Sequence, residues 1–136
     1  MDTFGAMCRL VAYAGPSVTV DRTLFAGSHS LLRQSWAPRE LLSGSVNADG
    51  FGVVWYPSEY EHPLRLARTE PAWYDPEVEP LLAAQRAGIC VAALRNATPG
   101  LPVERSGLLP LVLDRWAFTL NGYVPDFRAA HMRALR

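Results

Sequence analysis

Short apolar runs that end in turn residues recur along the chain, and each has the length of a β-strand rather than of a helix. Gly, Pro, Asn or Asp bounds most of them, as is typical of strands in a compact domain. The pattern predicts strands at Cys8–Ala14, Phe51–Tyr56, Leu64–Arg68, Ile89–Leu94, Leu111–Leu113 and Trp116–Leu120. The first should end at the turn Gly15-Pro16, and the last two should form a hairpin around Asp114-Arg115.

Segments between these strands have helical spacing. The first begins at Asp21, a residue that can cap a helix, and extends over 21–32, although Gly27-Ser28 weakens its middle and can split it. The second begins with Asp75-Pro76, a cap followed by proline in the first turn, and apolar residues then recur at helical spacing up to Gly88. Another helix is expected after Asp126. Strands with helices between them predict a layered α/β or α+β domain.

The length and the charge balance exclude several classes of protein. A chain of 136 residues with 49% apolar content fits one globular domain. Its 13 basic residues are all arginine and are balanced by 13 acidic ones, so no basic patch for nucleic acid or for an anionic membrane is expected. No apolar run approaches the roughly 18 to 20 residues of a membrane span, and the N-terminus does not read as a secretion signal. We therefore expect a cytoplasmic protein.

The chain has two cysteines, Cys8 and Cys90, without paired spacing and without a nearby histidine. A disulfide framework or a zinc site is therefore not expected, and we predict neither a metal nor a cofactor. For an arbitrary cysteine on a buried strand, the usual role is that of a small core residue.

The residue before Cys8 suggests a different role for this cysteine. If translation starts at Met7, removal of the methionine leaves Cys8 as the first residue, with its thiol and a free α-amine on one residue. The pKa of an α-amine is about 7.7 to 8.0, so near neutrality a useful fraction is unprotonated and can accept the thiol proton. Cys8 would then carry both a nucleophile and its base.

Several segments, in this order, resemble class II glutamine amidotransferase domains, and among them the γ-glutamyl amidohydrolase branch that includes the ergothioneine-pathway enzyme. They are MCRLVAYAG, HSLLRQSWAPRE, NADGFGVVWY, RNATPGLPVE and LNG, and the resemblance extends from Met7 to about Phe127. It implies an α+β fold of the N-terminal-nucleophile hydrolase type, an αββα four-layer sandwich. Residues 8–136 would be the N-terminal part of that domain, incomplete at the C-terminus, and residues 1–7 would be a leader or a start placed too early.

The resemblance also implies roles for individual residues. Cys8 would be the nucleophile that forms a γ-glutamyl thioester. Arg95 would bind the α-carboxylate of the glutamyl group, because a guanidinium fits a carboxylate through two parallel hydrogen bonds, and Thr98 would support this loop. Asn121 and Gly122 would form the oxyanion hole. From the residues alone, Arg95 can equally be a surface arginine, and Asn121-Gly122 is also the commonest pair for a tight hairpin turn.

The implied activity is hydrolysis of a γ-glutamyl amide bond in a small molecule, either an ergothioneine-type intermediate or glutamine. Two alternatives stay open: a glutaminase domain that passes ammonia to a synthetase partner, and a truncated, catalytically silent remnant. A homo-oligomer is left open as well. Two departures from the family bear on this choice. Leu120 stands where family members commonly have His, and the part of the family fold that supplies an acidic group for the substrate's α-ammonium lies beyond this sequence.

Other residues of the matching segments are expected to have structural roles. The turn residues Asn47, Asp49, Gly50 and Gly52 should let a strand pass close under the active site. The tryptophans are expected in the core, with Trp36 as a possible ligand contact: Trp36, Trp55, Trp73 and Trp116.

Overall fold

The structure is a computed structural model that describes residues 8–28, 30–36, 48–96 and 104–122. Some of the predictions above lie outside these residues. They concern residues 1–7, Asn47, the side chain of Trp36, Thr98 and the helix after Asp126.

A four-stranded antiparallel sheet forms the middle of the described fold, in the order β1-β4-β2-β3. Its strands are β1 (Arg9–Thr19), β2 (Phe51–Trp55), β3 (Leu64–Arg68) and β4 (Arg86–Leu94). The first and fourth strands of the chain pair along most of their length, whereas β2 and β3 form a hairpin on the other side of β4. Strands β1 and β3 are the edges of this sheet in the described part of the chain.

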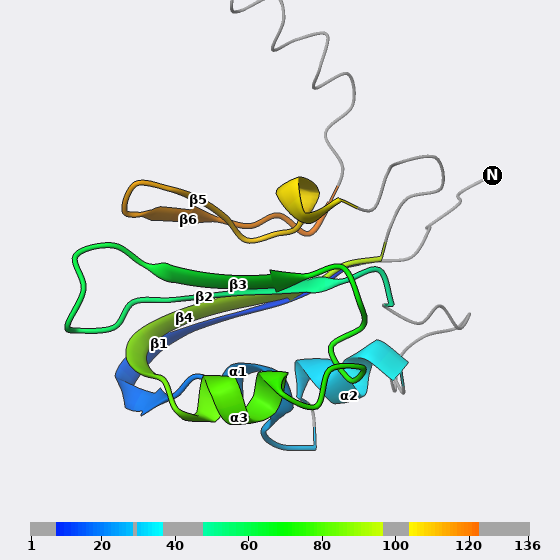
Figure 1. Ribbon diagram of the computed structural model, residues 1–136, viewed down its shortest axis with the longest axis horizontal. Coiled ribbons are helices and arrows are strands. Elements are labelled where there is room, and N and C mark those ends of the chain that lie inside the picture. Colours follow the sequence, from blue (N-terminus) through cyan, green and yellow to red (C-terminus); the bar gives the residue numbers. More distant parts are fainter. Residues whose placement is uncertain (1–7, 29, 37–47, 97–103, 123–136) are drawn as a thin grey trace, which may run out of the picture.

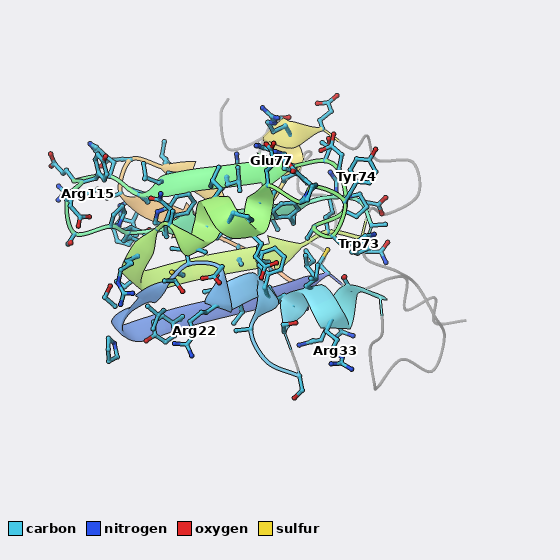
Figure 2. All side chains as sticks on the ribbon, turned by 60° about the horizontal axis from the view of Figure 1, so that its bottom comes forward. Arg22, Arg33, Trp73, Tyr74, Glu77 and Arg115 are labelled. Atoms are coloured by element: carbon cyan, nitrogen blue, oxygen red, sulfur yellow. The ribbon has the colours of Figure 1, made fainter. Side chains whose placement is uncertain are left out.

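Three short helices cover one face of the sheet: α1 (Arg22–Phe25), α2 (Leu31–Trp36) and α3 (Val78–Ala83). The first predicted helix is indeed split, because Gly27 adopts a φ of +86° between α1 and α2. Helix α1 begins after Asp21 as predicted, but the Asp21 side chain makes no cap hydrogen bond. The Asp21 carbonyl accepts hydrogen bonds from the N–H groups of Leu24 and Phe25 at 3.0 and 2.8 Å. Figure 2 shows Arg22 and Arg33 extending from this helical layer.

The hydrophobic core lies between the sheet and these helices. Its largest fully buried side chains include Phe51, Leu24 and Leu82, from the sheet and from two of the helices. Every residue of β2 is buried, so this strand is covered on both faces. Phe51, Val53 and Trp55 belong to the core cluster, and the alternating residues Gly52 and Val54 point to the opposite face.

A two-stranded hairpin lies on that opposite face (Figure 1), which it leaves open along β1, where Leu10 is 40% exposed. It consists of β5 (Leu111–Leu113) and β6 (Trp116–Phe118), preceded by the short 3₁₀ helix η1 (Arg105–Gly107). The hairpin is tied to the main sheet at its turn, where the Tyr56 hydroxyl donates to the Arg115 carbonyl at 3.0 Å. Beside this bond, His62 Nδ1 lies 3.3 Å from Asp114 Oδ1, with both side chains exposed.

The structure corrects several predicted boundaries. Strand β4 begins at Arg86 and not at Ile89, and helix α3 begins at Val78, after Glu77, and not directly after the predicted cap Asp75. Strand β1 does not end at Gly15-Pro16 but continues to Thr19, with a register shift between Ala14 and Val18 that accommodates this pair. Helix α3 ends at Ala83 instead of reaching Gly88, because the chain from Arg86 onward pairs with β1. Strand β6 ends at Phe118, two residues before the predicted end.

The tryptophan prediction holds only in part. Trp55 is buried, but Trp73 is 41% and Trp116 is 77% exposed, so the core expectation is wrong for these two residues. Trp116 shares one face of the hairpin with its partner Leu113, which is 79% exposed.

The predicted α+β class agrees with this arrangement of helices, an antiparallel sheet and a second antiparallel hairpin. The described residues form three layers, which are the helices, the four-stranded sheet and the hairpin (Figure 1). A second helical layer, which a four-layer sandwich requires, is not among residues 8–28, 30–36, 48–96 and 104–122. Within the same residues, no helix has the length and apolar character needed to span a membrane.

Candidate active site

Cys8 directly precedes β1, at the end of the sheet where β4 finishes. The pairing of Arg9 with Leu94 places Cys8 beside Arg95, although the two residues are far apart in the sequence. The Cys8 side chain is half-buried, and its Sγ lies 3.8 Å from the Asn96 carbonyl oxygen, which can accept a weak S–H hydrogen bond. Cys8 is therefore an accessible thiol at a strand end rather than a core cysteine.

The backbone of Arg95 is fixed by the turn that precedes β2. Its N–H donates to the Gly50 carbonyl at 2.8 Å, and its carbonyl accepts from the Asp49 N–H at 3.3 Å. Gly50 has a φ of +105°, and a Cβ there would meet the Arg68 carbonyl oxygen at 2.6 Å, so only glycine fits. The turn predicted as structural thus holds the residue predicted to bind substrate.

A pocket of about 210 Å³ opens where these strand ends meet. It is lined by Cys8, Arg9, Ala93, Leu94, Arg95, Asn96, Gly107, Leu109, Leu120 and Gly122. The structure therefore brings together three of the predicted site residues, Cys8, Arg95 and Gly122. Asn121 is exposed and is not among the lining residues, and Thr98 lies outside the described part.

Asn121 and Gly122 form a bend that follows β6, whereas the tight turn of the hairpin lies at Asp114-Arg115. Asp114 has the positive φ, 52°, that such a turn requires. Within the described chain, Asn121-Gly122 thus follows the second strand of the hairpin, as the sequence predicts, and is directed to the pocket through Gly122.

The segment between η1 and β5 closes the pocket over the sheet. A Cβ at Gly52 would lie 2.3 Å from the Leu109 carbonyl oxygen, so this segment can approach β2 only because residue 52 is glycine. Arg65 secures the segment from β3, donating from Nη2 to the Leu108 carbonyl at 2.7 Å and from Nε to the Pro110 carbonyl at 2.8 Å. The close passage expected at Gly52 is therefore real, and the segment that approaches is 108–110.

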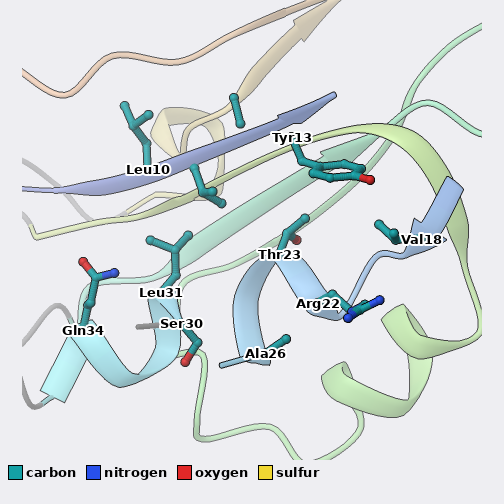
Figure 3. A pocket seen from close by; sticks show the side chains of 11 residues that line it. Leu10, Tyr13, Val18, Arg22, Thr23, Ala26, Ser30, Leu31 and Gln34 are labelled. Carbon is teal, nitrogen blue, oxygen red and sulfur yellow. The ribbon is translucent and has the colours of Figure 1, made fainter. Parts of the chain in front are cut away.

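Two larger hollows in the described chain contain neither cysteine. One, of about 540 Å³, lies between β1 and the helices α1 and α2, with Tyr13, Arg22 and Gln34 around it (Figure 3). The other, of about 580 Å³, lies along the hairpin and is mostly apolar. Size alone would favour these two, but only the smaller pocket contains a nucleophile beside a cation.

Burial distinguishes the two thiols. Cys90 is fully buried in the core, and this burial raises the pKa of its thiol to about 11, so it stays protonated at neutral pH. Both cysteines are free.

Burial, together with the charge of Arg105, lowers the pKa of Arg65. No group of three or more His, Cys, Asp or Glu side chains that could hold a metal occurs among the described residues.

Sequence reasoning gave no site role to six further lining residues, which are Arg9, Ala93, Leu94, Asn96, Gly107 and Leu109. The Asn96 carbonyl lies near Cys8, and a Cβ on Gly107 would lie 3.8 Å from Arg95 Nη1. Gly107 and Leu109 belong to a connection without periodic spacing, so no local pattern marked them.

No protein-family model matches the chain. Its curated relatives include the γ-glutamyl-hercynylcysteine sulfoxide hydrolases of Mycobacterium tuberculosis and Mycolicibacterium smegmatis. Each is 34% identical over 118 residues, which are 87% of this chain and 50% and 52% of theirs. The probable glutamine amidotransferase DUG3 of Saccharomyces cerevisiae is 26% identical, over 95% of this chain and 38% of its own length. The chain thus spans about half the length of the hydrolases it matches.

A solved structure has a similar fold. It is that of a glutamine aminotransferase class-II domain protein from Silicibacter pomeroyi, with a TM-score of 0.57 and 22% identity, covering 95% of this chain and 42% of that one. The comparisons confirm the resemblance to class II glutamine amidotransferases and to γ-glutamyl hydrolases, and the curated relatives are named as enzymes.

Proposed function

We propose that the chain is the nucleophile-bearing half of an N-terminal-nucleophile amidohydrolase that hydrolyses a γ-glutamyl amide bond, with Cys8 as its first residue. The observation that carries the proposal is the pocket that collects Cys8, Arg95 and Gly122 from three distant parts of the sequence. The names of the mycobacterial relatives support a γ-glutamyl substrate.

The first half of the reaction needs residues 1–7 to be removed, because an amide nitrogen on Cys8 has no basic lone pair. The free α-amine takes the thiol proton, and the Cys8 sulfur attacks the γ-carboxamide carbon. The carbonyl oxygen becomes negative and is stabilised by the Gly122 N–H and by the Asn121 side-chain amide, once this exposed side chain turns toward the pocket. The C–N bond then breaks, the amine leaves with the proton of the α-ammonium, and a γ-glutamyl thioester remains on Cys8.

Water completes the second half of the reaction. It gives a proton to the α-amine and adds to the thioester carbon, and the same oxyanion donors stabilise the second tetrahedral intermediate. The C–S bond breaks, glutamate leaves, and the Cys8 thiol is regenerated.

Arg95 provides the substrate's anchor in this proposal. Its guanidinium receives the α-carboxylate of the glutamyl group through two parallel hydrogen bonds, with Thr98 supporting the loop. The described lining of the pocket contains no carboxylate for the α-ammonium. We infer that the region of the relatives that this chain does not cover supplies this group, together with the second helical layer of a four-layer sandwich.

The test uses the chain with translation started at Met7. Intact mass should show Cys8 as the first residue, and the protein should release glutamate from γ-glutamyl amides. Replacing the nucleophile in Cys8→Ala should reduce the rate by roughly 10⁴-fold or more. Cys90→Ala serves as the matched control and should stay active, because Cys90 lies in the core. A Cys8→Ala variant as active as its parent would disprove the mechanism.

Two observations favour alternative functions. The absence of a carboxylate among the described lining residues favours a catalytically silent chain that at most binds a partner. The similarity to the yeast protein favours a glutaminase domain that passes ammonia to a synthetase. Absence of glutamate release from a chain that begins at Cys8 would support the first alternative. Release from glutamine alone would support the second.

A further inference from the structure

When the glutamyl group occupies the pocket as proposed, some lining residues contact neither its carboxylate nor its carbonyl oxygen. Arg95 takes the carboxylate and Gly122 takes the carbonyl oxygen, which leaves the lining residues that would face the departing amine. Among these, Asn96 contributes a carbonyl next to Cys8. Arg9 also lines the pocket, from the helical face of the sheet that it shares with its partner Leu94. Near Gly52 and Gly122, the larger lining side chains are Leu109 and Leu120.

Leu109 is held in place by its neighbours. Leu108 and Pro110 are fully buried, whereas Leu109 between them is half-buried and lines the pocket. Arg65 binds the carbonyl oxygens of both flanking residues, and the Leu109 carbonyl lies directly against Gly52. The backbone on both sides of Leu109 is therefore fixed to the sheet, and the position of its side chain does not depend on an unsupported loop.

Leu120 lies next to the proposed oxyanion donor. Its Cδ1 would be 3.8 Å from a Cβ placed on Gly122, and 39% of its surface is exposed. A substrate carbonyl that is bound at Gly122 has its amine nitrogen on the same carbon atom. The group attached to that nitrogen must therefore extend into the space beside Leu120.

We propose that Leu109 and Leu120 form an apolar wall for the leaving amine, and that the site selects γ-glutamyl amides of organic amines with an apolar group over glutamine. The inference rests on the proposed function and names its substrate class. Ammonia, which leaves from glutamine, makes no contact with either leucine. An alkyl or aromatic amine loses its hydration against both, and even one methylene in an apolar pocket changes discrimination by about tenfold or more.

The experiment compares two amides of equal intrinsic reactivity, γ-glutamyl-isoamylamide and γ-glutamyl-methylamide, with glutamine as a third substrate. For the chain that begins at Cys8, kcat/KM should be at least about tenfold higher for the isoamylamide than for the methylamide. Leu120→Asn and Leu109→Asn should each reduce this ratio severalfold, because the rate for the isoamylamide falls more than the rate for the methylamide. Leu111→Asn is the control, because Leu111 has a similar exposure of 41% but lies outside this pocket.

Arg65→Met tests whether Leu109 must be held in place. Arg65 does not line the pocket but binds the backbone beside Leu109. Its loss should lower the ratio of kcat/KM for the isoamylamide to that for the methylamide and leave the methylamide rate unchanged. The circular dichroism spectrum of the variant should match that of the parent. A severalfold fall in the rate for both amides, without a change in their ratio, would contradict the positioning role.

A binding measurement distinguishes failure of the apolar-wall inference from failure of the proposed hydrolase function. Calorimetry with the Cys8→Ala variant needs no catalysis and should show the isoamylamide binding at least about tenfold more tightly than the methylamide. Equal constants for the two amides, in turnover and in binding, would overturn the apolar wall and leave γ-glutamyl hydrolysis standing. Neither binding nor turnover of any of the three compounds would overturn both.

Discussion

At the scale of single residues, the two thiols have opposite environments. Cys8 is half-buried in a pocket at a strand end, whereas Cys90 is fully buried and has a pKa raised to about 11. A thiol reacts as the thiolate, and at pH 8 only about one Cys90 side chain in a thousand would be ionised. This difference is the physical reason for assigning chemistry to the first cysteine and packing to the second.

We predict that iodoacetamide at pH 8 alkylates Cys8 and leaves Cys90 unmodified in the folded chain. Peptide mass spectrometry of the treated protein provides the measurement. Modification of Cys90 should appear only in denaturant, or as the pH approaches about 11 and the buried thiol ionises. Equal labelling of both cysteines in the folded protein at pH 8 would show that Cys90 is not buried as described.

At the scale of elements, glycine decides how close the segment 108–110 can come to the sheet. A methyl group at Gly52 would lie 2.3 Å from the Leu109 carbonyl oxygen and 3.2 Å from Pro110. At Gly107, beside the same pocket, the nearest atom would be 3.8 Å away. The two positions therefore form a matched pair for one chemical change.

We expect Gly52→Ala to lower the free energy of unfolding by about 1–3 kcal/mol, the usual cost of overpacking a buried contact, and to weaken the pocket through Leu109. Gly107→Ala should change it by less than about 0.5 kcal/mol, as exposed sites usually do. Urea unfolding of both variants gives the comparison. If the two variants lose the same free energy of unfolding, the close approach at Gly52 does not contribute specifically to stability.

The elements also show what the sequence can predict. Strands β3 and β5 have the predicted bounds, and β2 ends one residue before its predicted end, because turn residues and β-branched or aromatic residues are local signals. Strand β1 passes its predicted end because its partner β4 is remote: Val18 and Thr19 pair with Ala87 and Arg86. The same pairing ends α3 early. As an edge strand, β1 tolerates Pro16, which a central strand would not.

The candidate site likewise combines residues that the sequence indicates with residues that only long-range packing brings to the pocket. The resemblance indicated Cys8, Arg95 and Gly122. Cys8 and Arg95 lie together because β1 and β4 are neighbours in the sheet, and Gly122 reaches the same pocket after the end of β6. Leu109 could not be predicted, because its place depends on a glycine in β2 and an arginine in β3. The order of the strands and the approach of the segment 108–110 to β2 depend on packing between remote parts of the chain. No single stretch of the sequence encodes them.

At the scale of the whole molecule, apolar side chains are distributed unevenly over the three layers. The helices bury Leu24, Leu31, Val78 and Leu82 against the sheet, although Leu81 is 44% exposed, and the hairpin exposes one complete face. Its inward residues Val112 and Ala117 are half-buried, whereas the alternating outward residues are 41% to 79% exposed. They are Leu111, Leu113, Trp116 and Phe118. Contiguous apolar surface of this kind usually marks a contact with another polypeptide.

We predict that the purified chain self-associates through this outward face, as a homo-oligomer of the kind left open by the sequence. Sedimentation velocity over a wide concentration range should show a mass that rises with concentration. The double variant Leu113→Arg, Trp116→Arg should stay monomeric, because two charges on each face cannot be buried against like charges without a large cost. Tyr60→Arg is the control, since Tyr60 is 63% exposed in the connection between β2 and β3 and away from the hairpin. A parent chain that is monomeric at every concentration, or a control that dissociates as the double variant does, would contradict an association through the hairpin.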